Sequence, residues 1–152
     1  ATDWLDNQTV AAETGSWDVS SSIQLAKLLP DLGIDFLDVS SGGNHKSQRI
    51  EPHTNYQIDL AGQIRQEIRA ANHTTLVGAV GFITEAHSAR DIVQGAEEEA
   101  RATEAILSGS KPRADAVLMA RQFLREPEWV LMAAKKLDVK VSLPWQFTRG
   151  LL

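Results

Sequence analysis

Three short segments carry the residues best suited to bind a charged small molecule. They are residues 40–45, 80–84 and 120–124, and each follows an apolar run that predicts a buried strand. Small residues such as Gly81 let backbone N–H groups approach a ligand closely, and Arg121 adds a permanent positive charge suited to phosphate. A helix is expected after each of the last two segments, and its N-terminus would favour an anion. These segments therefore predict an anion site, although their glycines equally suit plain tight turns.

Other kinds of chemistry find no support in the sequence. The chain has no cysteine, which excludes disulfides, thiolate zinc sites and cysteine nucleophiles. The four histidines share no helical face and no HExxH spacing, so no metal site is expected; they are His45, His53, His73 and His87. Nucleophile-elbow, Walker and GxGxxG motifs are also absent.

Charge and hydropathy narrow the range of partners. The formal net charge is −5 and no run of Lys and Arg exists, whereas a nucleic-acid module would usually show a basic face. No apolar run approaches the roughly 20 residues that span a bilayer. We therefore expect neither a nucleic-acid nor a membrane partner, and the absence of cysteine fits a cytoplasmic protein.

The elements that must position these segments follow from apolar periodicity and from helix-end signals. A helix is predicted from a serine cap at residues 20–22 to Gly33, and Pro127 suits the first position of the last helix. The pattern predicts strands at 34–40, 76–82 and 114–120, helices at 56–71, 85–107 and 127–137, and a short extended piece at 138–142.

Strands that alternate with helices predict an α/β fold with a parallel sheet and right-handed crossovers. Three or four strands cannot close a barrel. The chain of 152 residues is therefore either a small open domain or part of a larger fold, and its length alone favours the open domain.

Four motifs in order resemble one family. Residues 35–44 (DFLDVSSGGN), 77–84 (VGAVGFIT), 116–127 (AVLMARQFLREP) and 144–150 (PWQFTRG) are similar to the last three strands and the C-terminus of old yellow enzymes. The similarity is greatest to the thermophilic-like branch of FMN-dependent ene-reductases from bacteria and fungi, and it covers essentially the whole chain.

The resemblance implies that the fold is the C-terminal half of a (β/α)8 TIM barrel, with about strands 6–8 and their helices. Residues 1–152 would form one part of a flavin-binding domain. Residues 1–18 would be the loop after strand 5, and residues 143–152 would be the C-terminal tail.

The same resemblance assigns roles to individual residues. Ser40 would lie under the flavin or near its ribityl chain. Val80 and Gly81 would present backbone near the FMN phosphate, as would Ala120 and Arg121 after the next strand. The family usually has glycine where this chain has Ala120, and alanine would be costly if a positive φ were needed there. Arg149 matches an arginine that this branch inserts into a neighbouring subunit's active site.

The chain also departs from the family pattern. The flavin-tuning cysteine or threonine, the glutamine on the ring, the tyrosine proton donor and the substrate-anchoring histidine pair have no counterparts. The strand-5 arginine that holds the flavin is also missing. The segment is expected to supply the FMN phosphate site without the catalytic half.

The whole protein is expected to be an ene-reductase that uses NAD(P)H to reduce activated C=C bonds. The expected partners are the activated alkene, the missing N-terminal half of the barrel and further copies in a homo-oligomer. Two other hypotheses stay open. One is a self-contained small α/β domain that binds a phosphorylated ligand without catalysis. The other is a half-barrel phosphate binder that dimerises into a pseudo-barrel.

Overall fold

The computed structural model describes residues 15, 17–43, 50, 52–95 and 111–146 of the chain. Its elements, in chain order, are α2 (Val19–Leu28), the 3₁₀ turn η1 (Pro30–Leu32), β1 (Phe36–Val39), α3 (Tyr56–Ala70), β2 (Leu76–Val80), α4 (Ala86–Gln94), β3 (Ala116–Leu118), α5 (Arg121–Arg125) and α6 (Trp129–Lys136). This order confirms the predicted alternation of helices and strands and the α/β class.

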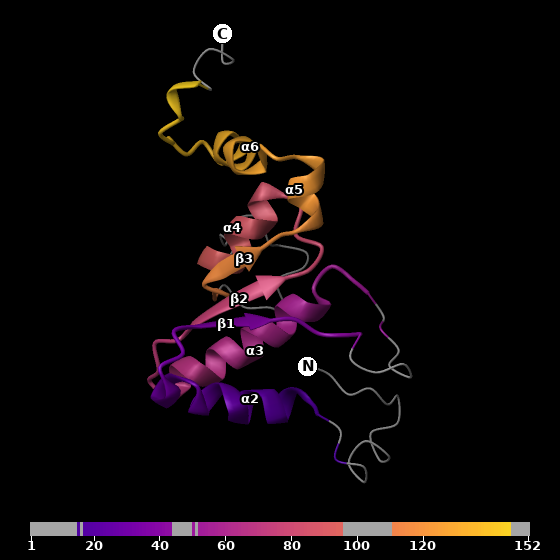
Figure 1. The fold of residues 1–152 in the computed structure, drawn as a ribbon, viewed down its shortest axis with the longest axis vertical. Coiled ribbons are helices and arrows are strands. Elements are labelled where there is room, and N and C mark those ends of the chain that lie inside the picture. The colour runs from indigo at the N-terminus through magenta and orange to yellow at the C-terminus, as the bar shows by residue number, and fades with distance from the viewer. Residues whose placement is uncertain (1–14, 16, 44–49, 51, 96–110, 147–152) are drawn as a thin grey trace.

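The three strands form one parallel sheet in the order β1-β2-β3. Leu37 lies opposite Val77, and Gly78 lies opposite Ala116. All three strands point the same way (Figure 1), so the loops that follow them lie at one edge of the sheet. The described parts of the three segments singled out from the sequence, residues 40–43, 80–84 and 120–124, therefore lie at this carboxyl edge.

The core lies between the sheet and the helices that pack on it. Helix α3 confirms the helix predicted at 56–71, and the apolar residues that recur along it at helical spacing are all buried: Ile58, Ala61, Ile64 and Ile68. Val77 of the central strand is fully buried against them. Each buried Ile or Val contributes roughly 1.5–3 kcal/mol relative to an exposed one. Helix α2 packs outside α3, and α4 contacts both β3 and α6 (Figure 1).

An ion-pair network fastens α3 to the opposite, amino edge of the sheet. Asp115 accepts hydrogen bonds from Arg65 Nε at 3.0 Å, Arg69 Nη2 at 2.9 Å and the Val77 N–H at 2.9 Å. Arg69 also donates to the carbonyls of His73 and Thr75, both at 2.9 Å. The network ties the amino ends of β2 and β3 to the helix, at the edge of the sheet opposite to the three segments.

The first helix begins differently from the prediction. Asp18, not one of the serines at 20–22, is the N-cap of α2, and its Oδ1 accepts from the Ser21 N–H at 2.7 Å. This hydrogen bond lowers the pKa of the Asp18 carboxyl. Gly33, with φ 78°, ends η1 rather than α2. The helix buries Ala26, while Leu25 and Leu28 are exposed.

The later helix boundaries also shift. Helix α4 ends at Gln94, where Gly95 has φ 81°, so the prediction of an unbroken helix over 85–107 is wrong; residues 96–107 lie outside the described residues. Helix α6 begins at Trp129, two residues beyond Pro127. The short extended piece predicted at 138–142 is not part of the described sheet, and Asp138, with φ 53°, lies in the turn after α6.

Candidate anion site

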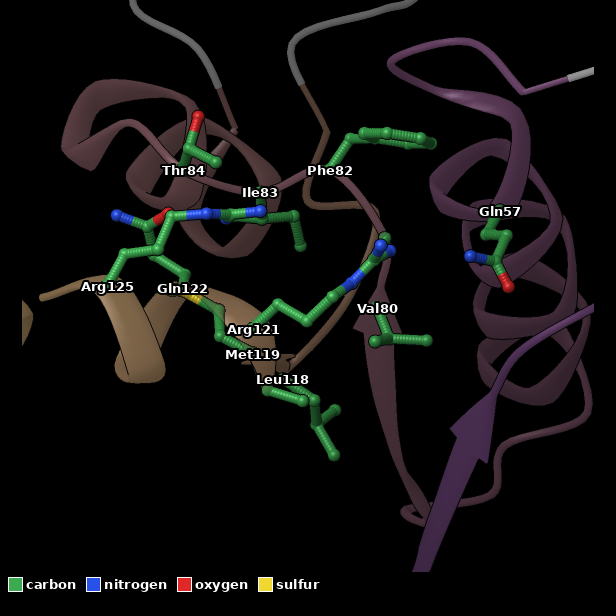
Figure 2. Close-up of a pocket in the computed structure, with 12 residues that line it drawn as sticks. Gln57, Val80, Phe82, Ile83, Thr84, Leu118, Met119, Arg121, Gln122 and Arg125 are labelled. Atoms are coloured by element: carbon green, nitrogen blue, oxygen red, sulfur yellow. The ribbon is translucent and has the colours of Figure 1, made fainter. Parts of the chain in front are cut away.

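A hollow of about 240 Å³ opens where β2 and β3 end. We call it the β2–β3 hollow. Its walls come from the loop after β2, the end of β3 with α5, and one residue of α3 (Figure 2). The lining residues are Gln57, Val80, Gly81, Phe82, Ile83, Thr84, Leu118, Met119, Ala120, Arg121, Gln122 and Arg125. Four of the predicted cofactor-binding residues thus meet in one place.

The charged side chains that line the hollow are all positive. Its lining holds two arginines, Arg121 and Arg125, and no carboxylate. Arg125 Nη1 donates to Gln122 Oε1 at 3.4 Å, whereas Arg121 forms no ion pair within the described residues. The Arg121 side chain reaches toward the Val80 side of the hollow (Figure 2). Uncompensated guanidinium groups on a concave surface favour an anion with several acceptor oxygens.

The loop after β2 is held in an unusual backbone conformation. Gly81 has φ 112° and Phe82 has φ 52°, and a positive φ is costly for a bulky residue. The Phe82 ring packs against Tyr56 with a centroid separation of 6.3 Å. From the other side, the indole Nε1 of Trp129 donates to the Thr84 carbonyl at 2.7 Å. Contacts from α3 and α6 therefore fix the loop that forms one wall.

Gln57 is the polar side chain that sequence reasoning missed. It lies in the first turn of α3 and is only 7% exposed. Its Oε1 accepts a hydrogen bond from the Ser41 N–H at 2.6 Å, and its Nε2 lies against Gly81, where a Cβ atom would overlap it. A signal was present in the sequence, because Gln57 occupies the same helical face as Ala61, Ile64 and Ile68.

Ala120 has an ordinary backbone conformation. Its φ is −114°, so alanine in place of the family's glycine carries no penalty for a positive φ. Residues 121–124, expected as part of a loop, instead belong to the short helix α5 (Arg121–Arg125), which directly follows Ala120. With only five residues, α5 has a small dipole, so attraction for an anion rests on the arginine side chains.

The remaining predicted residues are not brought into this hollow. Ser40 lines a separate hollow between α2, α3 and the end of β1, together with residues such as Trp17 and Leu29. Arg149 and His45 lie outside the described residues. No cluster of three or more potential metal ligands occurs in the part of the chain that the structure describes. Within that same part, no helix has the length and apolar character to cross a bilayer.

Comparison with known proteins gives a consistent set of relatives. The chain is 33% identical to an NADH:flavin oxidoreductase of Gibberella zeae, over 97% of this chain and 33% of that protein. It is 32% identical to an NADPH dehydrogenase of Bacillus licheniformis, over 91% of this chain and 34% of that protein. An NADPH dehydrogenase of Halalkalibacterium halodurans is 36% identical, over 93% of this chain and 35% of its own length. No protein-family model matches. The chain spans about a third of the length of the curated relatives that it matches.

Proposed function

We propose a function from the premise that this chain belongs, as a segment, to the NADH:flavin oxidoreductase family, also known as the old yellow enzymes. The chain would form about strands 6–8 of a TIM barrel that binds FMN and takes electrons from NAD(P)H. The whole protein would reduce activated C=C bonds such as those of enones. The names of the relatives support a flavin-linked, NADH- or NADPH-dependent oxidoreductase.

The observation that carries this proposal is the charge of the β2–β3 hollow, which has two arginines and no carboxylate in its lining. The hollow is about 240 Å³, smaller than the roughly 300–1,000 Å³ of pockets that hold a whole cofactor. It therefore fits the phosphate end of FMN better than the ring system. Val80, Gly81, Ala120 and Arg121 would hold that phosphate, and Ser40 would lie nearer the ribityl chain or the ring.

FMN, when bound, supplies the hydride chemistry. The residues of this chain would bind the cofactor and orient it. Arg121 would neutralise the phosphate, and the apolar side chains of Leu118 and Met119 would keep water from the inner wall. We further propose that Arg149 acts on a neighbouring subunit's active site in a cytoplasmic homo-oligomer. Replacing Arg149 by Ala in the whole enzyme should then lower turnover without loss of flavin.

The phosphate assignment can be tested on the purified chain by titrating FMN and riboflavin and following flavin fluorescence. Riboflavin lacks the phosphate, so FMN should bind at least tenfold more tightly. In the Arg121→Ala variant, FMN affinity should fall by about 10- to 100-fold, the equivalent of one charge-assisted contact, and riboflavin affinity should stay the same. Equal affinity of the wild-type chain for the two flavins, or no binding of either, would contradict the proposal.

The same titration distinguishes a flavoprotein segment from a self-contained, non-catalytic domain that binds phosphorylated ligands. A small domain that binds phosphorylated ligands in general would take inorganic phosphate or a sugar phosphate about as well as FMN. A flavoprotein segment would prefer FMN over both. The apolar side chains of Leu118 and Met119 would add to the binding of a flavin but not to the binding of phosphate or a sugar phosphate.

A further inference from the structure

Gln57 is almost completely buried, with 7% of the residue exposed, yet among the described residues only the oxygen of its amide has a hydrogen-bond partner. The oxygen accepts from the Ser41 N–H at 2.6 Å, while no residue in the described part of the chain is recorded as accepting a hydrogen bond from the nitrogen. A buried amide donor without an acceptor is unfavourable because it loses its hydrogen bond to water, so this nitrogen is expected to have an acceptor.

The orientation of the amide is determined by its neighbour. The Ser41 backbone offers an N–H group, which can only donate, so the atom of Gln57 that faces it must be the oxygen. The nitrogen is thereby directed to the other side, against Gly81 and along the wall of the β2–β3 hollow (Figure 2). The side chain cannot flip without placing its NH₂ group against the Ser41 N–H.

The nitrogen therefore joins a set of groups that are all donors. Arg121 and Arg125 line the same hollow, and its lining contains no carboxylate. Of the two, Arg121 reaches toward the Gln57 side of the hollow (Figure 2), so an acceptor placed between the Arg121 guanidinium and the Gln57 NH₂ group would satisfy both. A phosphate group offers several acceptor oxygens and a charge that matches the arginines.

We propose that Gln57 is a ligand-binding residue of this site, and that its Nε2 donates a hydrogen bond to a phosphate oxygen in the β2–β3 hollow. The proposal rests on the proposed function, which places the FMN phosphate there. Through Oε1 the same side chain holds the loop after β1, next to Ser40, so one residue couples two of the three loops at the carboxyl edge.

Two substitutions at Gln57 distinguish a role in phosphate binding from a role in holding the fold. Gln57→Glu keeps an oxygen for the Ser41 N–H but replaces the donor by a negatively charged acceptor. Gln57→Met has a similar size and removes both hydrogen bonds. The matched control is Gln66→Glu, which adds the same charge on the exposed side of the same helix.

Each variant is titrated with FMN and with riboflavin, and its fold is checked by circular dichroism. We expect Gln57→Glu to weaken FMN binding by about 30- to 100-fold, and Gln57→Met by about tenfold. Riboflavin affinity should change less than about threefold, and Gln66→Glu should match the wild type. If Gln57→Glu does not fold, Gln57→Met decides the question alone.

Two results would overturn the proposal while leaving the FMN site intact. In the first, the preference for FMN over riboflavin survives both Gln57 substitutions but is lost in Arg121→Ala. In the second, both flavins lose affinity equally, which would mean that Gln57 only supports the fold. If the wild-type chain shows no preference for FMN, the proposed function itself fails, and the role of Gln57 fails with it.

Discussion

Gly81 is the residue at which backbone conformation and binding are most closely joined. Its φ of 112° is unfavourable for any residue with a side chain, and a Cβ atom would overlap the Gln57 amide nitrogen. We expect Gly81→Ala to destabilise the fold by roughly 1–3 kcal/mol. It should also weaken FMN binding at least tenfold, because the loop and the amide must both move.

Gly95→Ala is the matched control for this prediction. Gly95 also has a positive φ, 81°, but it ends α4 and does not line the β2–β3 hollow. The control should lose a comparable amount of stability in urea unfolding and keep its FMN affinity. If the two variants lost affinity alike, the effect would come from general loosening of the fold and not from the site.

Asp115 tests the network at the amino edge of the sheet. Burial raises the pKa of its carboxyl, but the hydrogen bond from the Val77 N–H and the charges of Arg65 and Arg69 lower it more, so the pKa lies below its usual 3.8. At neutral pH, Asp115→Asn should reduce the free energy of unfolding by roughly 1–3 kcal/mol, because two guanidinium groups lose their counter-charge. Asp59→Asn, at an exposed pair with Arg113, should cost less than about 1 kcal/mol.

The pH dependence of this effect has a definite sign. A carboxyl whose pKa is lower in the folded state contributes its full stability above the unfolded-state pKa and loses it as pH falls through the folded-state value. The stability difference between the wild type and Asp115→Asn should therefore be constant from neutral pH down to about pH 5. It should shrink below pH 3.8, the usual pKa. A difference that stayed constant into strong acid would show that the ionised carboxylate contributes nothing.

The residue types in the sequence pointed to Arg121 and Gly81 but not to the buried Gln57. Arg121 and Gly81 stand out in the sequence because each does something that few other residues can. Gln57 does not stand out by residue type, since glutamine is common on helix surfaces; its place on the apolar face of α3 was the signal, and its importance comes from an amide held between Ser41 and Gly81. Only tertiary packing places those two loops around one side chain. Ser40 was identified by resemblance, and the structure places it in a different hollow.

At the scale of elements, the order of helices and strands was predictable and several of the ends were not. The apolar face of α3 is confirmed because Ile58, Ile64 and Ile68 follow the helical period. Pro127 was expected at the start of a helix, but the helix begins at Trp129. Pro127 instead lies in a tight turn that precedes the helix, in which the Trp129 N–H donates to the Glu126 carbonyl at 3.0 Å. A proline suits such a turn as well as the first turn of a helix, so the sequence does not distinguish the two.

Trp129 provides a test of how α6 supports the loop after β2. Its indole is 9% exposed and donates to the Thr84 carbonyl at 2.7 Å. Trp129→Phe keeps most of the apolar contact, including the edge contact with Phe123, but removes the donor. We expect a loss of about 1–2 kcal/mol in the free energy of unfolding, together with a several-fold weaker FMN affinity. An unchanged affinity would mean that Phe82 and Tyr56 alone hold the loop.

At the scale of the whole molecule, the described sheet has three parallel strands, and length alone favoured an open domain. The comparisons favour a part of a larger enzyme, because the chain matches only about a third of each relative. Composition and periodicity could not make this choice, since buried parallel strands have the same pattern in an open sheet and in a barrel. The motifs at residues 77–84 and 116–127 pointed to the family because they combine residue types with order and separation.

The exposed apolar surface beside β1 gives the prediction that separates a self-contained domain from a barrel segment. Phe36 and Leu76 are directly paired across β1 and β2, yet they are 41% and 48% exposed. Within the described sheet, β1 is an edge strand, and an exposed apolar edge favours pairing with another chain. The purified chain should therefore sediment as a species larger than its monomer mass of 16.6 kDa.

A lysine on the edge strand should oppose this association, because charge is one of the means by which natural edge strands avoid pairing. Phe36→Lys is expected to shift the sedimenting species toward the monomer. Leu124→Lys introduces the same charge at a leucine that is 83% exposed on α5, away from the β1 edge, and should leave association unchanged. A wild-type chain that is monomeric and unfolds cooperatively would instead favour the self-contained phosphate-binding domain, since such a sheet would need no further strands. Equal effects of both lysines would assign the association to net charge, and the β1 edge would then have no special part in it.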